Sequence, residues 1–544
     1  MELVEVRDLD GPNLFLLEPA IKVEFRVSPD DATDQRISRL RTIFQVAPPA
    51  DIGSNVQLVS LALMLCEAVR RIHANVGLPV PSVDWQPLET PNRSALVFGW
   101  SHRRAAMRIA RIIAAVATGT GDPPLGYEDE LVQLAASTAP DDRPLMVRDA
   151  DRRIPIVGVT GTNGKTTTTR LIAHILRNAG LVAGWSSSSG VYINGDLVLD
   201  GDYTGPAGAR RVLDDETVDV AVLETARGGI LLRGIAYESN DVGIFTNVSP
   251  DHLDLQGIRT VEGLTKVKST VVRVTRPTGY AVLNADDALV RSVAQDVRAR
   301  VFFVSQDPQN TTVDAHVQAG GFALIARDQR VWLWQHGHAT KLIDVADIPI
   351  TYGGRARHMV ENALCAAAAG IGLGRSEEEV RSGLVSFKND ATHNLGRLNL
   401  FDVDGVRVIV DFAHNEVGLR YLLSLANDVK GTNGRIISII GTAGDRTDEA
   451  LVGIGRLAGT ASDRVFIKET KKYLRGRLSN DELNSFYVKG LNAAASAPWS
   501  IERDEIAALE AALAEAEPDD VVVLMCLEHI PDIQQILDER GRPV

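Results

Sequence analysis

A glycine-rich stretch that ends in lysine and threonine is the part of this sequence best suited to chemistry. It follows the β-branched, apolar run 154–160, precedes a helical pattern over 170–179, and reads Gly161-Thr162-Asn163-Gly164-Lys165-Thr166-Thr167. Backbone N–H groups of such a turn, together with the positive end of the helix dipole, hold a phosphate group. The lysine adds a point charge, and the first threonine hydroxyl is placed for Mg²⁺. The order of strand, glycine turn, Lys-Thr and helix therefore predicts a nucleotide phosphate site.

The turn departs from the most common phosphate-loop pattern. Val159 stands where the Gly-x-x-x-x-Gly-Lys pattern has its first glycine, so the narrower signature Gly-Thr-Asn-Gly-Lys-Thr identifies the loop. A chance glycine turn is the competing interpretation, and the strand and helix on either side argue against it.

Polar side chains follow two further apolar runs, at the ends of predicted strands. Glu224 ends the run 219–224, and Asp251 and His252 follow the run 241–247. The carboxyl ends of strands in an open α/β sheet face the ligand crevice, so we expect these side chains around the phosphate loop. A carboxylate is the ligand that Mg²⁺ prefers, and the histidine indicates a second metal position. A structural ion pair for Glu224 and a structural hydrogen bond for His252 are the alternatives.

The elements that position these residues predict an α/β protein with several domains. Strands alternate with helices from about residue 154, as in a mostly parallel sheet, and a second unit of the same kind follows. An earlier α+β unit shows an alternating strand at 21–27 and a buried helix at 56–69. The predicted parts are an N-terminal domain (1–118), a linker rich in Gly, Pro and Asp (119–152), a central domain (153–391) and a C-terminal domain (392–544).

Composition excludes some classes of function. The formal net charge of −14 argues against a general nucleic-acid binder, which needs clustered lysine and arginine. No run of about 18 apolar residues predicts a membrane span, and the first residues do not read as a secretion signal. The cysteines are scattered in apolar contexts, as expected in a reducing compartment. We therefore expect a cytoplasmic protein.

Taken together, the motifs resemble those of the Mur ligase superfamily, and within it the C-terminal ligase half of cyanophycin synthetases. The resemblance runs from about residue 154 to the end, and the first hundred residues, including 10–13 (Asp-Gly-Pro-Asn), resemble the N-terminal domain of those synthetases. It implies a central P-loop ATPase domain and a C-terminal Rossmann-like domain behind a small α+β domain. The segments that carry it are the phosphate loop, 201–206, 223–230, 247–253, 283–287, 396–397, 411–414 and 474–477.

Two departures bear on function. Cyanophycin synthetases carry an ATP-grasp domain between these two parts, where this chain has only the segment 119–152, which argues against a one-chain polymerase. The family pattern continues with acidic residues after Lys468-Glu469, where this chain has Thr470-Lys471-Lys472. This reversal of charge favours an acidic or neutral amine over arginine as substrate.

The resemblance implies an ATP-dependent carboxylate–amine ligase. It would join a carboxylate of an amino acid or small peptide to an amine through an acyl phosphate, releasing ADP and phosphate. We expect the amine substrate to be an amino acid. The loop 161–167 would hold the phosphates, Thr166 and Glu224 the first Mg²⁺, and Glu224 and His252 the second. Lys268 stands where several relatives carry a carbamylated lysine, and an unmodified surface lysine is the alternative.

Other roles also come from the resemblance. Asn362 would read adenine, while Arg397 would reach phosphate, Asp411 the ribose and His414 the base on domain closure. Structural or surface roles remain open for all four. Candidate substrate contacts, for which surface charge or turn chemistry are alternatives, are Asp202, Thr204, Arg227, Arg446, Arg475 and Arg477.

Two other functions fit the same sequence. One is a folylpolyglutamate-synthase-type or peptidoglycan-type member of the superfamily, and the other is a nucleotide-binding scaffold that has lost its chemistry. The identities of the acid and the amine, the nature of the product and the formation of a homo-oligomer stay open at this point.

Overall fold

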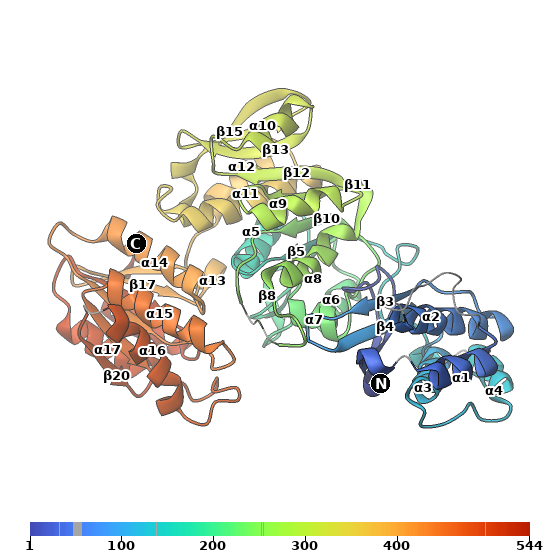
Figure 1. Ribbon diagram of the computed structural model, residues 1–544. Coiled ribbons are helices and arrows are strands. Elements are labelled where there is room, and N and C mark those ends of the chain that lie inside the picture. Colours follow the sequence, from blue (N-terminus) through green and yellow to red (C-terminus); the bar gives the residue numbers. More distant parts are fainter. Residues whose placement is uncertain (32, 47–56, 138, 252, 254, 495–496) are drawn as a thin grey trace.

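Three domains lie in a row along the molecule, with the central one in the middle (Figure 1). The structure is a computed structural model that describes residues 1–31, 33–46, 57–137, 139–251, 253, 255–494 and 497–544. Along this described chain, no helix combines the length and the apolar content needed to cross a membrane.

The N-terminal domain is an antiparallel sheet with helices packed against one face. The strands are ordered β1-β2-β4-β3, and β2 alternates buried and half-buried residues, as expected for a sheet covered on one side. Apolar residues of α2 and α3 fill the core beneath the helices. The bounds are β1 (Glu2–Leu9), β2 (Ala20–Arg26), β3 (Val83–Pro87), β4 (Arg93–Gly99), α1 (Asp34–Phe44), α2 (Gln57–Asn75) and α3 (Arg103–Thr118).

The segment 119–152 differs from the predicted plain linker. It contains the helix α4 (Tyr127–Ala135), whose Leu131 is fully buried in the N-terminal core. The sequence on either side of the helix is rich in Gly and Pro, which obscured a short amphipathic pattern. Because Leu131 is part of the N-terminal core, this domain extends beyond residue 118.

The central domain is built on a large twisted sheet, parallel in its middle and antiparallel at both edges. The order is β15-β14-β13-β12-β11-β10-β5-β9-β6-β7-β8, and β5 (Ile156–Thr160) lies between β10 (Asn240–Phe245) and β9 (Val220–Glu224). The middle strands are buried on both faces and therefore read as continuous apolar runs. The other strands are β6 (Ala183–Ser187), β7 (Gly190–Ile193), β8 (Asp196–Leu199), β11 (Thr275–Asn284), β12 (Arg300–Ser305), β13 (Phe322–Arg327), β14 (Arg330–Gln335) and β15 (His338–Asp344).

Helices cover both faces of this sheet. One face packs against α5 (Lys165–Asn178), α11 (Arg357–Gly372) and α12 (Glu377–Ser386). The opposite face packs against α6 (Pro206–Leu213), α7 (Arg227–Leu232), α8 (Val261–Arg273), α9 (Ala288–Ser292) and α10 (Thr311–Gln318).

The C-terminal domain is a second, mostly parallel α/β sheet in the order β20-β19-β18-β21-β17-β16-β22. Its strands are β16 (Asn399–Val403), β17 (Val406–Asp411), β18 (Ile436–Ile440), β19 (Arg464–Lys468), β20 (Trp499–Glu502), β21 (Val521–Met525) and β22 (Arg542–Pro543). Its helices are α14 (Glu416–Val429), α15 (Asp448–Ala461), α16 (Asn480–Ala494), α17 (Glu505–Glu515) and α18 (Ile530–Arg540). The predicted fold class, α/β with two α/β units behind a small α+β domain, is confirmed.

A short connection joins the central and C-terminal domains. It runs from α13 (Ala391–Asn394) to β16, and within it the fully buried Leu398 adopts a left-handed backbone conformation with φ of 52°. A non-glycine residue in that region stores strain and persists only when its surroundings hold it. Tyr352 Oη donates a hydrogen bond to the carbonyl oxygen of Leu398, and the Leu398 N–H donates to Asp411, which supply that support.

Candidate active site

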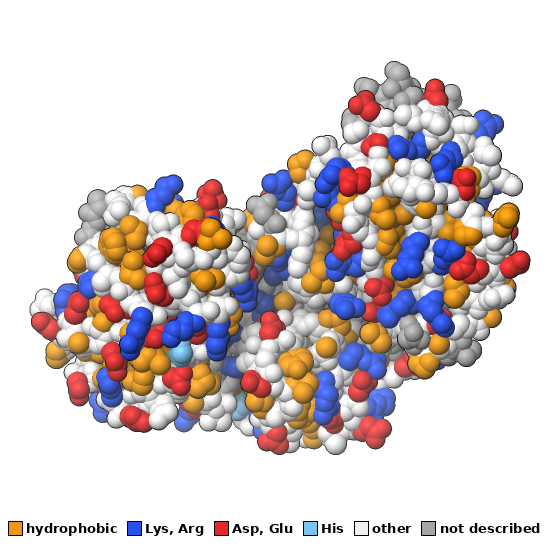
Figure 2. Space-filling model, turned by 90° about the horizontal axis from the view of Figure 1, so that it is seen from below, with side chains coloured by type: hydrophobic (Ala, Val, Ile, Leu, Met, Phe, Trp, Pro, Cys, Tyr) orange, Lys and Arg blue, Asp and Glu red, His pale blue; other side chains and the backbone are white. Residues whose placement is uncertain are grey.

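The carboxyl ends of the central strands open into a cleft that faces the C-terminal domain. The cleft has a volume of about 320 Å³ and receives side chains from both domains. Lysine and arginine side chains, drawn in blue, gather in the crease between the C-terminal domain and the central domain (Figure 2). Of the predicted site residues, those that line it are Thr162, Asn163, Gly164, Lys165, Thr166, Thr167, Asp202, Thr204, Glu224, Asn362, Arg397, Asp411, His414, Arg446 and Arg475.

The phosphate loop has the backbone that its glycines suggest. Gly164 adopts φ of +82°, and a Cβ there would lie 2.1 Å from Asn362 Oδ1, so only glycine fits. The loop is held from below, where Thr162 N–H donates to Asn247 O at 2.8 Å and Asn163 N–H donates to Asn247 Oδ1 at 2.9 Å. Lys165 Nζ donates to Thr162 O at 2.8 Å and so folds over the loop. The loop is thus shaped as an anion cradle at the start of α5.

Hard oxygen ligands for a cation meet at the start of α5. Thr166 Oγ1 donates to Glu224 Oε2 at 2.9 Å and lies 3.0 Å from Ser188 Oγ. Carboxylate and hydroxyl oxygens fit Mg²⁺, which takes one or two protein carboxylates and completes its shell with water and phosphate. His252, predicted as a further ligand, lies outside the described residues. Within the described chain, no three His, Cys, Asp or Glu side chains form a ready-made metal cluster.

Lys268 is buried behind the phosphate loop rather than exposed on the surface. It projects from α8, and its Nζ donates to Gly161 O at 2.5 Å. Burial lowers its pKa well below the usual value, and the charge of Lys165 lowers it further. Lys268 is only 5% exposed, so the surface position assumed by the alternative is wrong, while its modification stays a prediction.

Arg397 reaches from the interdomain connection to the part of the cleft beside Thr166 and Ser188. Its Nη2 donates to Ser188 Oγ at 3.1 Å and to Thr166 Oγ1 at 3.4 Å, and its guanidinium lies 4.4 Å from the ring centre of Phe412. Burial lowers its pKa, while the neighbouring Asp411 and Glu224 oppose this effect. Arg397 therefore offers a positive charge beside the predicted cation ligands.

Asp411 is tied to the interdomain connection. Its Oδ2 accepts the N–H of Leu398 at 2.7 Å, and burial raises its pKa. Its carboxylate lines the cleft, which leaves its predicted contact with ribose open.

The far end of the cleft joins α11 of the central domain to α14 of the C-terminal domain. The rings of His358 and Tyr421 stack across it with centroids 4.8 Å apart. Asn362 is buried there, with its Oδ1 accepting from Thr168 Oγ1 at 3.3 Å. Glu361 accepts from Asn247 Nδ2 at 2.8 Å, and burial raises its pKa to about 7. The aromatic pair and the buried polar groups suit a flat heterocycle with polar edges.

Three contacts join the central domain directly to the C-terminal domain beside the loop. Asn415, the N-cap of α14, donates from Nδ2 to Asn163 Oδ1 at 3.0 Å. Arg446 Nε lies 3.3 Å from Asp251 Oδ1, and His414 Nε2 lies 3.8 Å from Asp251 Oδ2. Burial lowers the pKa of His414. His414 thus faces Asp251 as well as the cleft.

The arginines predicted to grip substrate differ in their freedom. Arg477 donates to Gly444 O at 3.0 Å, to Arg446 O at 2.9 Å and to Asp448 at 2.7 Å, so it ties two loops together. Arg475 lines the cleft and pairs with Asp445 at 2.9 Å. These contacts favour a structural role for Arg477 and leave Arg475 available to a substrate.

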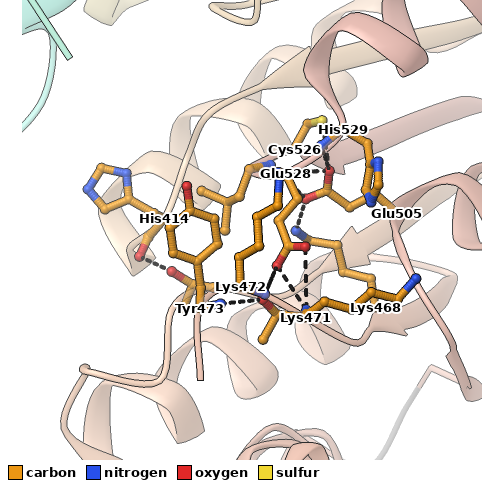
Figure 3. A network of polar contacts seen from close by, with 12 residues as sticks. His414, Lys468, Lys471, Lys472, Tyr473, Glu505, Cys526, Glu528 and His529 are labelled. Atoms are coloured by element: carbon orange, nitrogen blue, oxygen red, sulfur yellow. Dashed lines mark hydrogen bonds and ion pairs between the residues drawn. The ribbon is translucent and has the colours of Figure 1, made fainter. Parts of the chain in front are cut away.

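A buried carboxylate fixes the loop that carries Arg475. Glu505 pairs with Lys468 and accepts the N–H groups of 527–529, while Glu528 accepts those of Lys471 and Lys472 at 3.1 Å (Figure 3). The two loops after β19 and β21 are therefore braced against each other at the rim of the cleft.

The remaining predicted substrate residues surround the start of α7. Asp202 Oδ1 accepts from Thr204 Oγ1 at 2.7 Å, which is local turn chemistry, although both residues line the cleft. Arg227 is buried, and its Nη1 donates to Leu255 O at 3.0 Å. Burial lowers its pKa. These contacts leave the substrate roles of Asp202, Thr204 and Arg227 as predictions.

Sequence reasoning missed Arg170. It lies one turn after Thr166 on α5, and its guanidinium donates to Leu395 O at 3.2 Å and to Ser189 Oγ at 2.8 Å. Burial, with help from the charge of Arg397, lowers its pKa to about 10. The i, i+4 spacing from Thr166 was the available signal, because residues four apart share one face of a helix. The stacking of Tyr421 on His358 had no comparable signal.

Comparison with known proteins identifies the family. The model of the Mur ligase middle domain matches residues 159–370, and that of the Mur ligase glutamate ligase domain matches residues 396–526. Cyanophycin synthetase from Synechocystis sp. is 42% identical over 373 residues, which are 68% of this chain and 42% of that protein. The chain thus spans about two fifths of the length of the curated cyanophycin synthetases it matches.

More distant relatives are covered more completely. A UDP-N-acetylmuramoylalanine–D-glutamate ligase from Desulfitobacterium hafniense is 30% identical over 402 residues, which are 71% of this chain and 73% of that ligase. The structure of E. coli FolC in complex with DHPP and ADP shares the fold with a TM-score of 0.53 at 21% identity, covering 71% of this chain and 89% of that one. These matches confirm the resemblance seen in the motifs, and the chain belongs to the Mur ligase family.

Proposed function

We propose that this protein is an ATP-dependent ligase that joins a carboxylate to an amine through an acyl phosphate. The observation that carries the proposal is the Thr166 hydroxyl, which bonds to Glu224 in its own domain and to Arg397 from the interdomain connection. A phosphate loop, cation ligands and an arginine from the far side of a cleft are the parts that phosphoryl transfer needs. The family membership and the ATP-dependent chemistry of the Mur ligases support the same reading.

The nucleotide would lie along the cleft. Its phosphates would bind the amides of 161–167 and the charge of Lys165, and its base would bind near Asn362 and the stacked rings of His358 and Tyr421. Asp411 would bind the ribose and His414 would face the base side of the C-terminal domain. The ADP in the FolC complex is a property of that protein and suggests the same kind of ligand here.

Thr166 and Glu224 would hold one Mg²⁺, and Glu224 with His252 a second. Bound Mg²⁺ would neutralise charge on the phosphates and align them. In our proposal Lys268 is carbamylated, which replaces a buried amine by an anion that supports the second site. A related FolC-type synthase has been solved with Mn and AMPPNP bound, consistent with a divalent cation.

The reaction has two steps. An oxygen of the acid attacks the γ-phosphorus and the bond to ADP breaks, which gives an acyl phosphate. The amine nitrogen then attacks the acyl carbon, and the tetrahedral species expels inorganic phosphate and loses a proton. Arg397 and Lys165 stabilise the charge on the transferred phosphoryl group, while the braced loops of the C-terminal domain position the amine. Arg475 and Arg446 are the candidates to orient a carboxylate of either substrate.

A substrate panel with two variants tests the proposal. Amino acids and aspartyl or glutamyl peptides are paired as acid and amine, and phosphate release from ATP is measured together with the mass of the product. Release should require both partners, and Lys165→Ala and Glu224→Gln should each lower it by a factor of about 10³ or more because phosphate and cation binding are lost. Lys266→Ala, on the exposed side of α8, is the matched control and should keep wild-type turnover.

Other outcomes decide between the alternatives. Extension of tetrahydrofolate with glutamate would favour a folylpolyglutamate-type enzyme. Nucleotide binding without a condensation product across the whole panel would favour a scaffold that has lost its chemistry, and full turnover in both site variants would refute the proposed phosphate and cation sites.

A further inference from the structure

The N-terminal domain touches the central domain through its backbone near residue 11. Asp10 N–H donates to Arg233 O at 2.7 Å, and Ile235 N–H donates to Pro12 O at 2.8 Å. The chains approach so closely that a Cβ at Gly11 would lie 1.9 Å from Ile235 O. The two domains are therefore packed backbone against backbone at this point.

A second contact is made by one carboxylate, that of Glu89 between β3 and β4. Its Oε2 accepts the N–H of Arg259 at 2.5 Å and that of Thr260 at 2.8 Å, and its Oε1 accepts from Thr260 Oγ1 at 2.9 Å. A Cβ at Gly263 would lie 1.7 Å from Oε1, so glycine is needed for the carboxylate to reach this place. A residue of the N-terminal domain thus occupies the start of α8.

This contact completes the capping of α8. Thr260 is the N-cap, and its Oγ1 accepts from Gly263 N–H at 3.0 Å while donating to Glu89. The negative charge also lies at the positive end of the helix dipole, where it is favourable. Glu89 therefore accepts the hydrogen bond that orients the capping hydroxyl of Thr260.

Helix α8 leads from this contact to the phosphate loop. Lys268 lies seven residues after the first residue of α8, which is two turns or about 10 Å along the axis, and its Nζ donates to Gly161 O. The intervening residues 263–265 and 267 are buried, and Leu264 and Val267 belong to the core packed against the sheet. The contact of Glu89 and the amine of Lys268 are thus joined by one continuous, mostly buried helix.

We infer that Glu89 is a positioning residue by which the N-terminal domain places Lys268 against the nucleotide site. The inference rests on the role of Lys268 in the proposed function. It assigns to the N-terminal domain a task in the ligase reaction that needs no substrate contact of its own.

The test uses the full chain with Glu89→Ala, Lys268→Ala and the double variant, titrated with AMPPNP in the presence of Mg²⁺. Glu89→Ala should raise the dissociation constant about tenfold, because a misplaced supporting group weakens a positioned site. If Glu89 acts through Lys268, the same change should have no added effect in the Lys268→Ala background. An equal added loss there would overturn the inference.

Hydrogen exchange supplies a readout independent of the ligand. Peptides covering 259–268 should exchange faster in Glu89→Ala than in wild type, and Glu89→Gln, which keeps one acceptor, should lie between them. Glu67→Ala, whose carboxylate pairs with Arg70 and Arg71 on its own helix α2, is the matched control and should change neither exchange nor binding. Unchanged exchange in Glu89→Ala would refute the positioning.

Failure of the proposed role of Lys268 can be told apart from failure of the inference about Glu89. Wild-type affinity in Lys268→Ala, with α8 still loosened by Glu89→Ala, would mean that Lys268 has no part in the nucleotide site and would remove the functional half of the inference.

Discussion

At the scale of single residues, Lys268 best illustrates how burial sets chemistry. Its amine is enclosed behind the phosphate loop and beside Lys165, and both desolvation and the like charge lower its pKa. Carbon dioxide reacts with an uncharged amine, and the positive charge of Lys165, which disfavours the ammonium ion, would stabilise the anionic carbamate that we propose. The same lysine on the surface would stay protonated at neutral pH.

We predict that activity depends on bicarbonate through Lys268. Turnover should fall in degassed buffer without bicarbonate and return when bicarbonate is added, as followed by phosphate release. Lys268→Ala should be inactive and insensitive to bicarbonate, with partial rescue by a short carboxylic acid that replaces the carbamate. Full activity of wild type in bicarbonate-free buffer would contradict the carbamate.

The lowered pKa also has a consequence for stability in bicarbonate-free buffer. The unfolded chain protonates this amine up to the usual lysine value of 10.5, whereas the folded state keeps it uncharged above its lowered pKa. The unfolded state binds more protons in that window, so the free energy of unfolding should rise with pH there. Lys268→Met should remove this rise in denaturant titrations.

At the scale of elements, helix α5 does more than begin at the phosphate loop. Its first turn carries Lys165 and Thr166, and its second turn carries Arg170, which bonds to the carbonyl oxygen of Leu395 in the interdomain connection. The same connection carries Arg397 into the cleft, where it donates to Thr166. Helix α5 therefore begins at the phosphate loop and also anchors the interdomain connection that carries Arg397.

We predict that Arg170→Met loosens the interdomain connection. Loss of hydrogen bonds from a charged group should lower the free energy of unfolding by about 2 kcal/mol, measured by denaturant titration. Turnover should fall by a larger factor than the apparent affinity for ATP, because Arg397 is misplaced. Arg177→Met on the same helix, where the exposed guanidinium contacts Asn194, is the control, and equal effects of both variants would contradict the role of Arg170.

At the scale of the whole molecule, the cleft is complete only when the central and C-terminal domains meet. The stacked rings of His358 and Tyr421 and the bond from Asn415 to Asn163 each join residues from the two domains. A domain arrangement that opened the cleft would separate these pairs and carry Arg397 away from Thr166. Domain closure would therefore assemble the site in the same step.

We predict that Asn415→Ser weakens closure without weakening α14. Serine is also a good N-cap, so the thermal midpoint should stay near that of wild type, while its shorter side chain loses the bond to Asn163. Turnover should fall, and small-angle scattering with AMPPNP and Mg²⁺ should give a larger radius of gyration than wild type. An unchanged radius and rate would show that this bond does not support closure.

Much of the fold could be predicted from the chain, because the decisive signals are local. Apolar runs bounded by glycine or acidic residues predicted the strands that lead to Glu224, the phosphate loop and Asp411, and each is present. Helix α4 was missed because its few apolar residues gain meaning only when Leu131 is buried under α3. The roles of the site residues stay predictions, since geometry alone does not test them.

By itself the sequence determined the phosphate loop, since strand, turn and helix are neighbours along the chain and their spacing dictates the backbone. The tertiary structure decided which side chains meet it. Lys268 arrives from 107 residues away, Arg397 from 231 and Asn415 from 252, and nothing in local periodicity encodes such pairings. They follow from how buried sheets and helices pack, and that packing also turned Arg477 into a brace between loops.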